Sequence, residues 1–305
     1  MSLSSHSAGG PPPDRPPLRA EEAPVPWSFR ETWLALLIPL VPWLLLSLGA
    51  QLQGSRLPNP KTPLPWQQDL AGALAAALST VVVEGAFLLV ALFFARRALR
   101  RQTQTQPGAE PAATSTSEAE GTSTPPRAVP AAKGSHSHVS LGMVLQALGL
   151  RRFRPLFLWL VVGFLALLYV VNSLYSALLE GLKLPLQTND QVILESSRLA
   201  PLTTTVLLVL AVIVAPVCEE IFFRGFVFPG LRRGLAPGWA VVVSALVFAL
   251  AHADLGSLPV LIVIGLLLAV LRWWSGSLYP GLLLHVLNNG ISAVVIVLYM
   301  LGSLH

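Results

Sequence analysis

The chain has 305 residues, of which 53% are hydrophobic and 11% are charged, and its formal net charge is +5. Soluble domains carry about 25% charged residues, so this composition excludes an ordinary water-soluble protein and predicts one that crosses the membrane several times. The arginines lie mainly at the ends of apolar runs, which is typical of membrane topology, and we expect no nucleic-acid partner. Cys218 is the only cysteine, which excludes an intrachain disulfide.

The N-terminal part of the sequence predicts a tail followed by two spans. Residues 1–30 are rich in Pro, Ser and Gly and predict a disordered tail. Within residues 31–101, two apolar runs are long enough to cross the hydrocarbon core of a bilayer, at 33–52 and 70–95. The second run contains Glu84, which either contributes to a site or forms a hydrogen bond to a neighbouring helix.

A polar segment separates these spans from the rest of the chain. Residues 102–140 contain few large apolar side chains and predict a long disordered linker. Residues 141–154 then predict a short amphipathic helix on the membrane surface. Because the arginine-rich loops fall on one side of the predicted spans, the positive-inside rule places the N-terminus and this linker in the cytoplasm.

Residues 141–305 are predicted to form the body of the protein. After the amphipathic helix come five further apolar runs, at 156–182, 202–228, 239–252, 258–274 and 278–301. The sequence therefore predicts an all-α fold, a polytopic transmembrane helical bundle with about seven spans. We expect a multi-pass protein of the cell membrane, with the lipid bilayer as its main surroundings.

The run 202–228 contains three ionisable residues, Glu219, Glu220 and Arg224. An ionisable group at the bilayer centre costs at least ~2.5–3.5 kcal/mol, so such residues indicate a functional site. Glu220 and Arg224 are four residues apart and can pair on one helix face, which leaves Glu219 free to face a cavity. The alternative is a buried ion-pair cluster that only fixes helix packing. Pro229 and Gly230 predict the end of this helix.

Two later apolar runs contribute histidines, His252 and His285, and the second also carries Asn289 four residues on. A carboxylate can act as a general base on water, and His and Asn side chains can donate hydrogen bonds to a developing oxyanion. Two histidines and Glu219 are also the donor set of a zinc site with an open position. The residues therefore predict hydrolysis at a carbonyl, with or without a divalent metal such as zinc.

These residues form three short motifs, Glu219-Glu220-x-x-x-Arg224, Phe248-x-x-x-His252 and His285-x-x-x-Asn289. The motifs resemble the signature of the CPBP (CAAX protease and bacteriocin-processing, or Abi) family of intramembrane endopeptidases. The resemblance covers about residues 202–301. It implies a helical membrane fold and cleavage of a membrane-associated or lipidated protein or peptide substrate.

The resemblance also implies a role for each motif residue. Glu219 and His252 would activate water, Glu220 with Arg224 would support the site, and His285 with Asn289 would stabilise the oxyanion. Members of the family are commonly described as metalloproteases, although a metal-free mechanism is also argued for them. The alternative function is a non-catalytic protein of the same fold that acts in bacteriocin self-immunity or partner binding. An ion-coupled or proton-coupled transporter is a third hypothesis.

Overall fold

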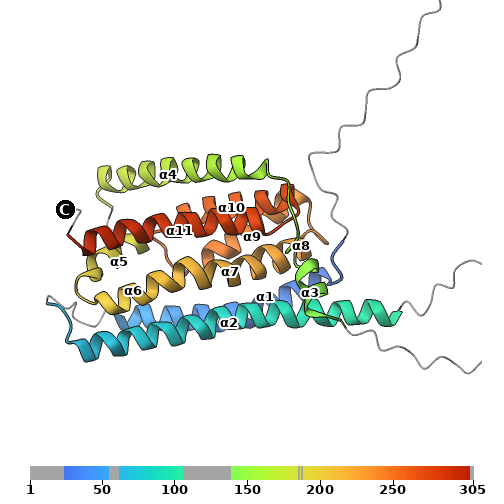
Figure 1. Cartoon of the computed structure of the whole chain (residues 1–305), viewed down its shortest axis with the longest axis horizontal. Coiled ribbons are helices and arrows are strands. Elements are labelled where there is room, and N and C mark those ends of the chain that lie inside the picture. The colour runs from blue at the N-terminus through green and yellow to red at the C-terminus, as the bar shows by residue number, and fades with distance from the viewer. Residues whose placement is uncertain (1–23, 55–61, 106–138, 185, 187, 303–305) are drawn as a thin grey trace, which may run out of the picture.

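The computed structural model describes residues 24–54, 62–105, 139–184, 186 and 188–302, and over these residues the chain is a bundle of helices without strands (Figure 1). Six helical segments are long and apolar enough to cross a membrane. They are α1 (Phe29–Gly54), α2 (Trp66–Thr105), α4 (Phe157–Gly181), the composite segment Pro201–Leu231, α10 (Leu258–Ser275) and α11 (Tyr279–Met300). The prediction of a multi-pass membrane bundle is confirmed.

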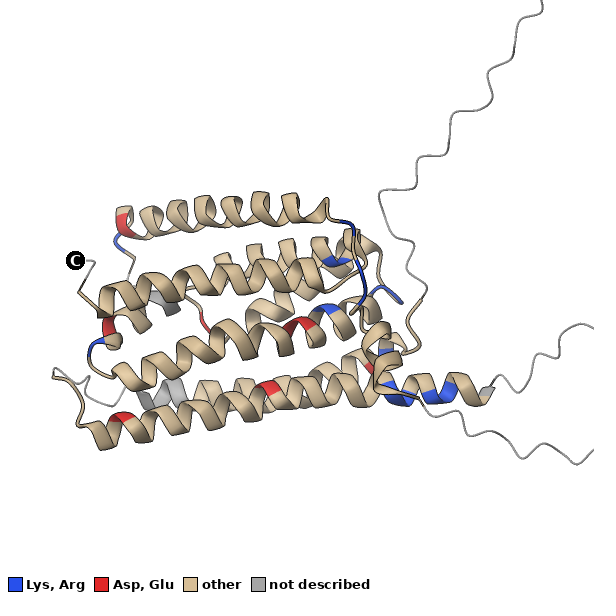
Figure 2. Ribbon diagram, in the orientation of Figure 1, with Lys and Arg blue, Asp and Glu red and all other residues tan. Residues whose placement is uncertain are grey.

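The remaining predicted span is α9 (Pro237–Ala251), which has 15 residues. At 1.5 Å per residue it is about 22 Å long, shorter than the ~30 Å hydrocarbon core. Each of the seven predicted runs thus corresponds to one helical segment, and six of them reach spanning length. Figure 2 shows that most Lys and Arg residues lie at the end of the bundle where α2 finishes.

The segment Pro201–Leu231 changes its helical geometry along its length. Regular turns in α6 (Pro201–Val209), α7 (Ala215–Glu219) and α8 (Phe228–Leu231) alternate with two π-helical stretches, η1 (Leu210–Val214) and η2 (Glu220–Val227). Such wide turns occur frequently at functional sites. The segment begins where Asp69 of α2 accepts hydrogen bonds from the backbone N–H groups of Leu202 and Thr203, both at 2.8 Å. A carboxylate from another helix therefore caps α6.

The predicted end at Pro229 and Gly230 is wrong, because both residues lie inside α8, which continues to Leu231. Pro229 stands in the first turn after the π-helical stretch, where a missing N–H is tolerated. Gly230 serves the packing of α1: a Cβ atom there would overlap the Thr32 hydroxyl and lie 2.9 Å from Trp27 Nε1.

Packed or helical residues extend into both the predicted disordered tail and the predicted disordered linker. Trp27 lies in the predicted tail of residues 1–30, yet it is fully buried and donates a hydrogen bond from Nε1 to the Phe226 carbonyl at 3.0 Å. Helix α2 extends to Thr105, inside the predicted linker of residues 102–140. Residues 1–23 and 106–138 lie outside the described part of the chain.

The amphipathic helix predicted over residues 141–154 is only half as long, because α3 (Leu141–Ala147) ends at a buried turn. Leu148 is fully buried, and Gly149 has a φ of +98°. The Gly149 carbonyl accepts a hydrogen bond from the Leu278 N–H at 3.0 Å. In the loop that follows, Arg151 Nε donates to the Gly276 carbonyl at 2.7 Å. A second short helix, α5 (Asn189–Ser197), lies between the predicted spans 156–182 and 202–228 and begins in a capping box formed by Thr188 and Gln191.

We predict that Gly149→Ala destabilises the protein by about 1–3 kcal/mol. An alanine would have to adopt the left-handed conformation, and its Cβ would lie 2.9 Å from Nη2 of the buried Arg272. Reversible unfolding in mixed micelles measures the effect. Gly163→Ala in α4 is the matched control, because a Cβ there meets nothing within 4 Å. Equal stability of the two variants would contradict the prediction.

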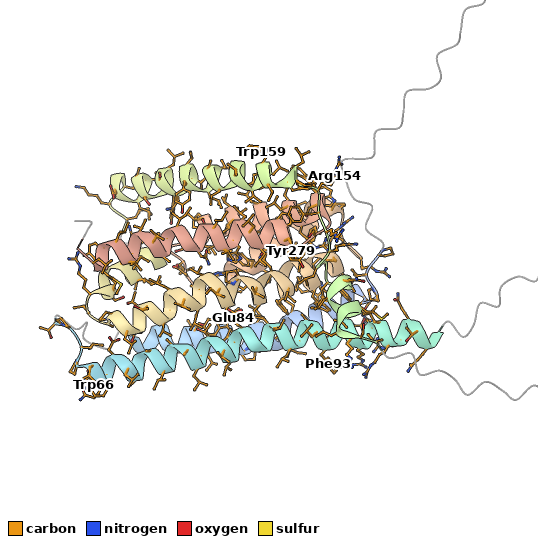
Figure 3. The ribbon with its side chains drawn as sticks, in the orientation of Figure 1. Trp66, Glu84, Phe93, Arg154, Trp159 and Tyr279 are labelled. Atoms are coloured by element: carbon orange, nitrogen blue, oxygen red, sulfur yellow. The ribbon has the colours of Figure 1, made fainter. Side chains whose placement is uncertain are left out.

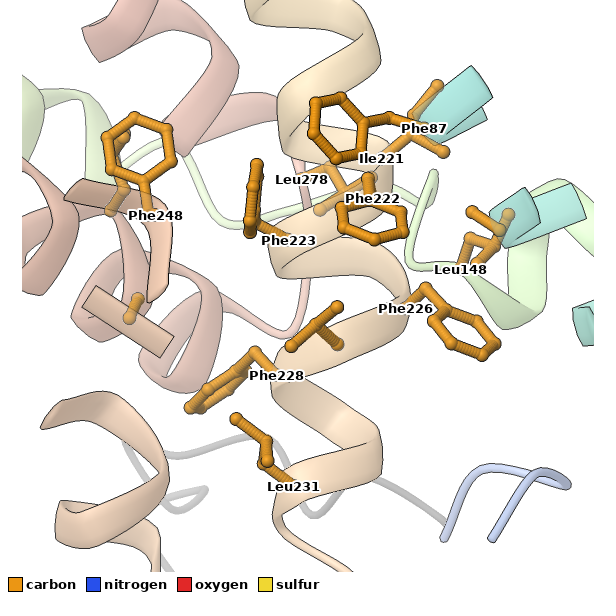
Figure 4. Packing of buried hydrophobic residues seen from close by; sticks show 14 of the residues in the cluster. Phe87, Leu148, Ile221, Phe222, Phe223, Phe226, Phe228, Leu231, Phe248 and Leu278 are labelled. Atoms are coloured by element: carbon orange, nitrogen blue, oxygen red, sulfur yellow. The ribbon is translucent and has the colours of Figure 1, made fainter. Parts of the chain in front are cut away.

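Phenylalanine side chains from α2, η2, α8 and α9 form part of the buried core of the bundle (Figure 4). Phe223 of η2 lies between Phe87 of α2 and Phe248 of α9, with ring centroids 5.6 and 5.4 Å away. Such tilted and edge-to-face arrangements are favourable for aromatic pairs. This packing fixes the rotation of η2, and therefore the direction in which its charged side chains point.

Candidate active site

Glu219, His252 and His285 come from three different helical segments and meet inside the bundle. Glu219 ends α7, His252 caps the C-terminal end of α9, and His285 lies in α11. One Glu219 oxygen, Oε1, is 3.9 Å from His252 Nε2, and the other, Oε2, is 3.6 Å from His285 Nε2. The two imidazoles, one from α9 and one from α11, therefore face the same carboxylate.

The pairing of Glu220 with Arg224 that the spacing predicts is present. Arg224 Nη1 lies 3.1 Å from Glu220 Oε1, and both side chains are almost completely buried. The Arg224 guanidinium also lies 4.0 Å from the centroid of the Phe248 ring and donates from Nη2 to the Gly265 carbonyl at 3.3 Å. The arginine thus links η2 to both α9 and α10, directly beside the histidines.

The orientation of His252 is set by its own helix. Its Nδ1 lies 2.9 Å from the Phe248 carbonyl oxygen, which can only accept a hydrogen bond. This contact assigns the proton of the neutral imidazole to Nδ1 and leaves a lone pair on Nε2. Because Glu219 Oε1 is also an acceptor and lies 3.9 Å away, the two atoms can both accept hydrogen bonds from a single water.

His285 lies between the two carboxylates of the first motif. Its Nδ1 is 3.6 Å from Glu220 Oε1, while its Nε2 faces Glu219. Gly281, one turn earlier in α11, makes this approach possible, because a Cβ there would lie 2.8 Å from Glu220 Oε2. The need for a glycine at this position was not apparent from the sequence, where Gly281 precedes the third motif without belonging to it.

Asn289 lies on α11 one turn beyond His285, but its amide donates to another partner. Its Nδ2 forms a hydrogen bond to the Ala211 carbonyl in η1 at 2.9 Å, and its Oδ1 accepts one from Asn288 at 3.2 Å. Asn289 therefore connects α11 to the π-helical stretch that precedes Glu219. To bind an oxyanion, this amide must exchange the Ala211 carbonyl for the oxygen of a substrate.

A pocket of about 220 Å³ opens beside Glu219 and His252. Residues of α1 and α2 also line this pocket, among them Trp43, Glu84 and Phe87. Glu84 is buried, and its Oε2 has no hydrogen-bond partner among the described residues. Figure 3 labels Glu84 near the middle of α2. Of the two roles that the sequence allowed for Glu84, this placement favours a site role over a purely interhelical hydrogen bond.

The predicted metal candidates Glu219, His252 and His285 have the donor atoms that zinc prefers. Within the described part of the chain, however, no group of three His, Cys, Asp or Glu side chains is arranged to hold a metal ion. The two Glu219 oxygens instead face one histidine each.

Comparison with known proteins finds a family model that matches the helices carrying this site. The family model described as type II CAAX prenyl endopeptidase Rce1-like matches residues 201–291, which include all six predicted site residues. The membrane-embedded CAAX protease MroQ of Staphylococcus aureus (strain USA300) is 29% identical over 141 residues, covering 43% of this chain and 55% of that protein. The chain thus spans about half the length of this curated relative. No solved structure matches the present chain.

Proposed function

Because a family model and a curated relative both support the CPBP family, we propose that this protein is a membrane-embedded endopeptidase. The observation that carries the proposal is the contact of one carboxylate, Glu219, with two histidines beside a pocket. The substrate is a membrane-associated or lipidated protein or peptide, whose scissile bond enters the pocket. The arginine-rich end of the bundle faces the cytoplasm.

Hydrolysis proceeds in two steps in this proposal. A water held between Glu219 Oε1 and His252 Nε2 attacks the substrate carbonyl and gives a proton to Glu219. The new C–O bond forms as the carbonyl π electrons move onto oxygen, and an N–H of His285 stabilises this oxyanion. Glu219 then returns the proton to the leaving nitrogen as the C–N bond breaks. Asn289 supports the site by holding η1 against α11.

A cleavage assay on the full-length protein in lipid vesicles tests this function. The substrates are peptides with a C-terminal CAAX sequence, with and without a prenyl group, and membrane-inserted peptides without that sequence. We expect cleavage by the parent protein and none above background with Glu219→Ala or His252→Ala. Equal cleavage by the parent and both variants would rule out the proposed site. Metal content and activity, measured before and after chelator treatment, distinguish a zinc-dependent mechanism from a metal-free one.

In this proposal the Oε2 atom of Glu84, which lines the same pocket as Glu219 and has no partner among the described residues, forms a hydrogen bond that positions the bound substrate. Glu84→Leu is expected to lower kcat/KM by about 5–30-fold, the effect of losing one hydrogen bond of ~1–2 kcal/mol. Glu84→Gln retains a hydrogen-bonding group and is expected to keep most activity. The measurements are kcat and KM separately, together with their pH profiles. Unchanged kinetics and pH profile in Glu84→Leu would show that Glu84 has only a packing role.

A further inference from the structure

One face of α2 changes from apolar to basic along its length. Leu89, Leu92 and Phe93 are followed on the same face, at spacings of three and four residues, by Arg96, Arg97 and Arg100. Leu89 and Phe93 are largely exposed, at 68% and 59% of their surface. Figure 3 labels Phe93 at the part of α2 that α3 approaches. This face, which we call the α2 stripe, shares no lining residue with the pocket of the active site.

The α2 stripe forms one side of a groove of about 600 Å³. Leu141 and Val144 of α3 form the other side. Among the described residues, no carboxylate lines the groove, although Arg101 at its edge is paired with Glu31 at 2.6 Å. Arg96, Arg97 and Arg100 are exposed and make no ion pair with any residue in the described ranges. The groove therefore has one end that carries these three positive charges and another end that is apolar.

The dimensions of this stripe match the boundary between acyl chains and head groups. From Leu89 to Arg100 the helix rises about 16 Å, at 1.5 Å per residue. Over this distance the surroundings of a membrane helix change from hydrocarbon to the polar interface. A soluble anion would contact only the arginine end, and a neutral lipid would leave the three charges without a partner. An anionic phospholipid satisfies both ends of the groove.

We propose that the groove between α2 and α3 binds an anionic glycerophospholipid. Its phosphate lies against Arg96, Arg97 and Arg100, and an acyl chain follows Leu89, Leu92 and Phe93. Basic pockets between membrane helices are known to bind anionic head groups in this way. Val144 lines the groove and is also buried in the core, so the lipid stabilises the docking of α3 on α2.

Lipid titration of the full-length protein tests the arginine end. The protein is purified in neutral detergent and mixed with phosphatidylglycerol or phosphatidylcholine, and bound lipid is counted by native mass spectrometry alongside the unfolding temperature. The variant is R96Q/R97Q/R100Q. The control is R152Q/R154Q/R233Q, which removes three exposed arginines outside the groove.

We expect phosphatidylglycerol, and not phosphatidylcholine, to remain bound to the parent protein and to raise its unfolding temperature. The groove variant should bind phosphatidylglycerol about fivefold more weakly for each arginine removed, whereas the control variant should bind it as the parent does. Equal losses in the two variants would show attraction to surface charge alone and overturn the proposal. Undiminished binding by the groove variant would overturn it too.

A second pair of variants tests the apolar end. Phe93→Gln is expected to weaken phosphatidylglycerol binding, whereas Leu78→Gln, which replaces a similarly exposed side chain of α2 outside the groove, should leave it unchanged. Inorganic phosphate at the same concentration should not raise the unfolding temperature. If it reproduced the full effect of the lipid, the groove would be a phosphate site and the proposal of a lipid would be wrong.

Discussion

Replacing Glu219 by glutamine is expected to lower the rate constant for peptide cleavage by about 10²–10⁴-fold, the contribution typical of a general base. The amide keeps the size of the side chain but cannot accept a proton from water. Glu219 Oε1 lies 3.9 Å from His252 Nε2. The other carboxylate of the first motif, Glu220, faces Arg224 and His285 instead. Single-turnover cleavage in lipid vesicles measures the rate without interference from product release.

Glu180→Gln provides the matched control, because Glu180 is an exposed carboxylate near the end of α4. The Glu180→Gln variant should cleave peptides at the parental rate. The unfolding temperature of both variants should stay close to that of the parent, which separates a chemical defect from a folding defect. Cleavage by Glu219→Gln at the rate of the control would contradict the assignment of Glu219 as the base.

Glu220→Ala is expected to lower the free energy of unfolding by about 3–5 kcal/mol, more than any other single substitution considered for this protein. The substitution leaves the Arg224 guanidinium, which has no exposed surface, without its carboxylate partner. It also removes the carboxylate that faces His285 Nδ1. The measurement is the free energy of unfolding in mixed micelles. Activity should fall with stability, because Arg224 contacts the Phe248 ring beside His252.

The double variant Glu220→Leu, Arg224→Met separates lost charge pairing from lost packing. Apolar groups of similar volume can replace a buried ion pair at little cost in stability. We therefore expect the double variant to be more stable than Glu220→Ala, although it lacks both charges. If the double variant were as unstable as the single one, the destabilisation would come from packing rather than from an unpaired charge.

The sequence predicted the helices well because an apolar run of about 20 residues has few alternatives in a membrane. The constant rise of a helix also allowed Glu219, His252 and His285 to lie at similar depths, without requiring that they meet. Their side chains meet as expected. These features depend on local periodicity and spacing alone, which a single sequence contains.

Features that depend on which helices touch could not be predicted in the same way. The spacing of Asn289 from His285 predicted a common face, but not that the Ala211 carbonyl would take its amide hydrogen. That Glu84 and Glu219 line one pocket requires α2 to pack beside the segment Pro201–Leu231. Gly149 ends α3 because the turn beside it must pass over the Arg272 guanidinium. In each case the partner lies more than 70 residues away in the sequence.

Part of the pocket lining comes from α1 and α2, outside residues 201–291 that match the family. In the proposed function, the groups that carry out the reaction and these other pocket residues therefore come from separate stretches of the chain. Selectivity for substrates could then change without altering the groups proposed to hydrolyse the bond. We expect a chimera that exchanges residues 24–105 for the equivalent helices of a relative to retain turnover while acquiring that relative's preference among peptides.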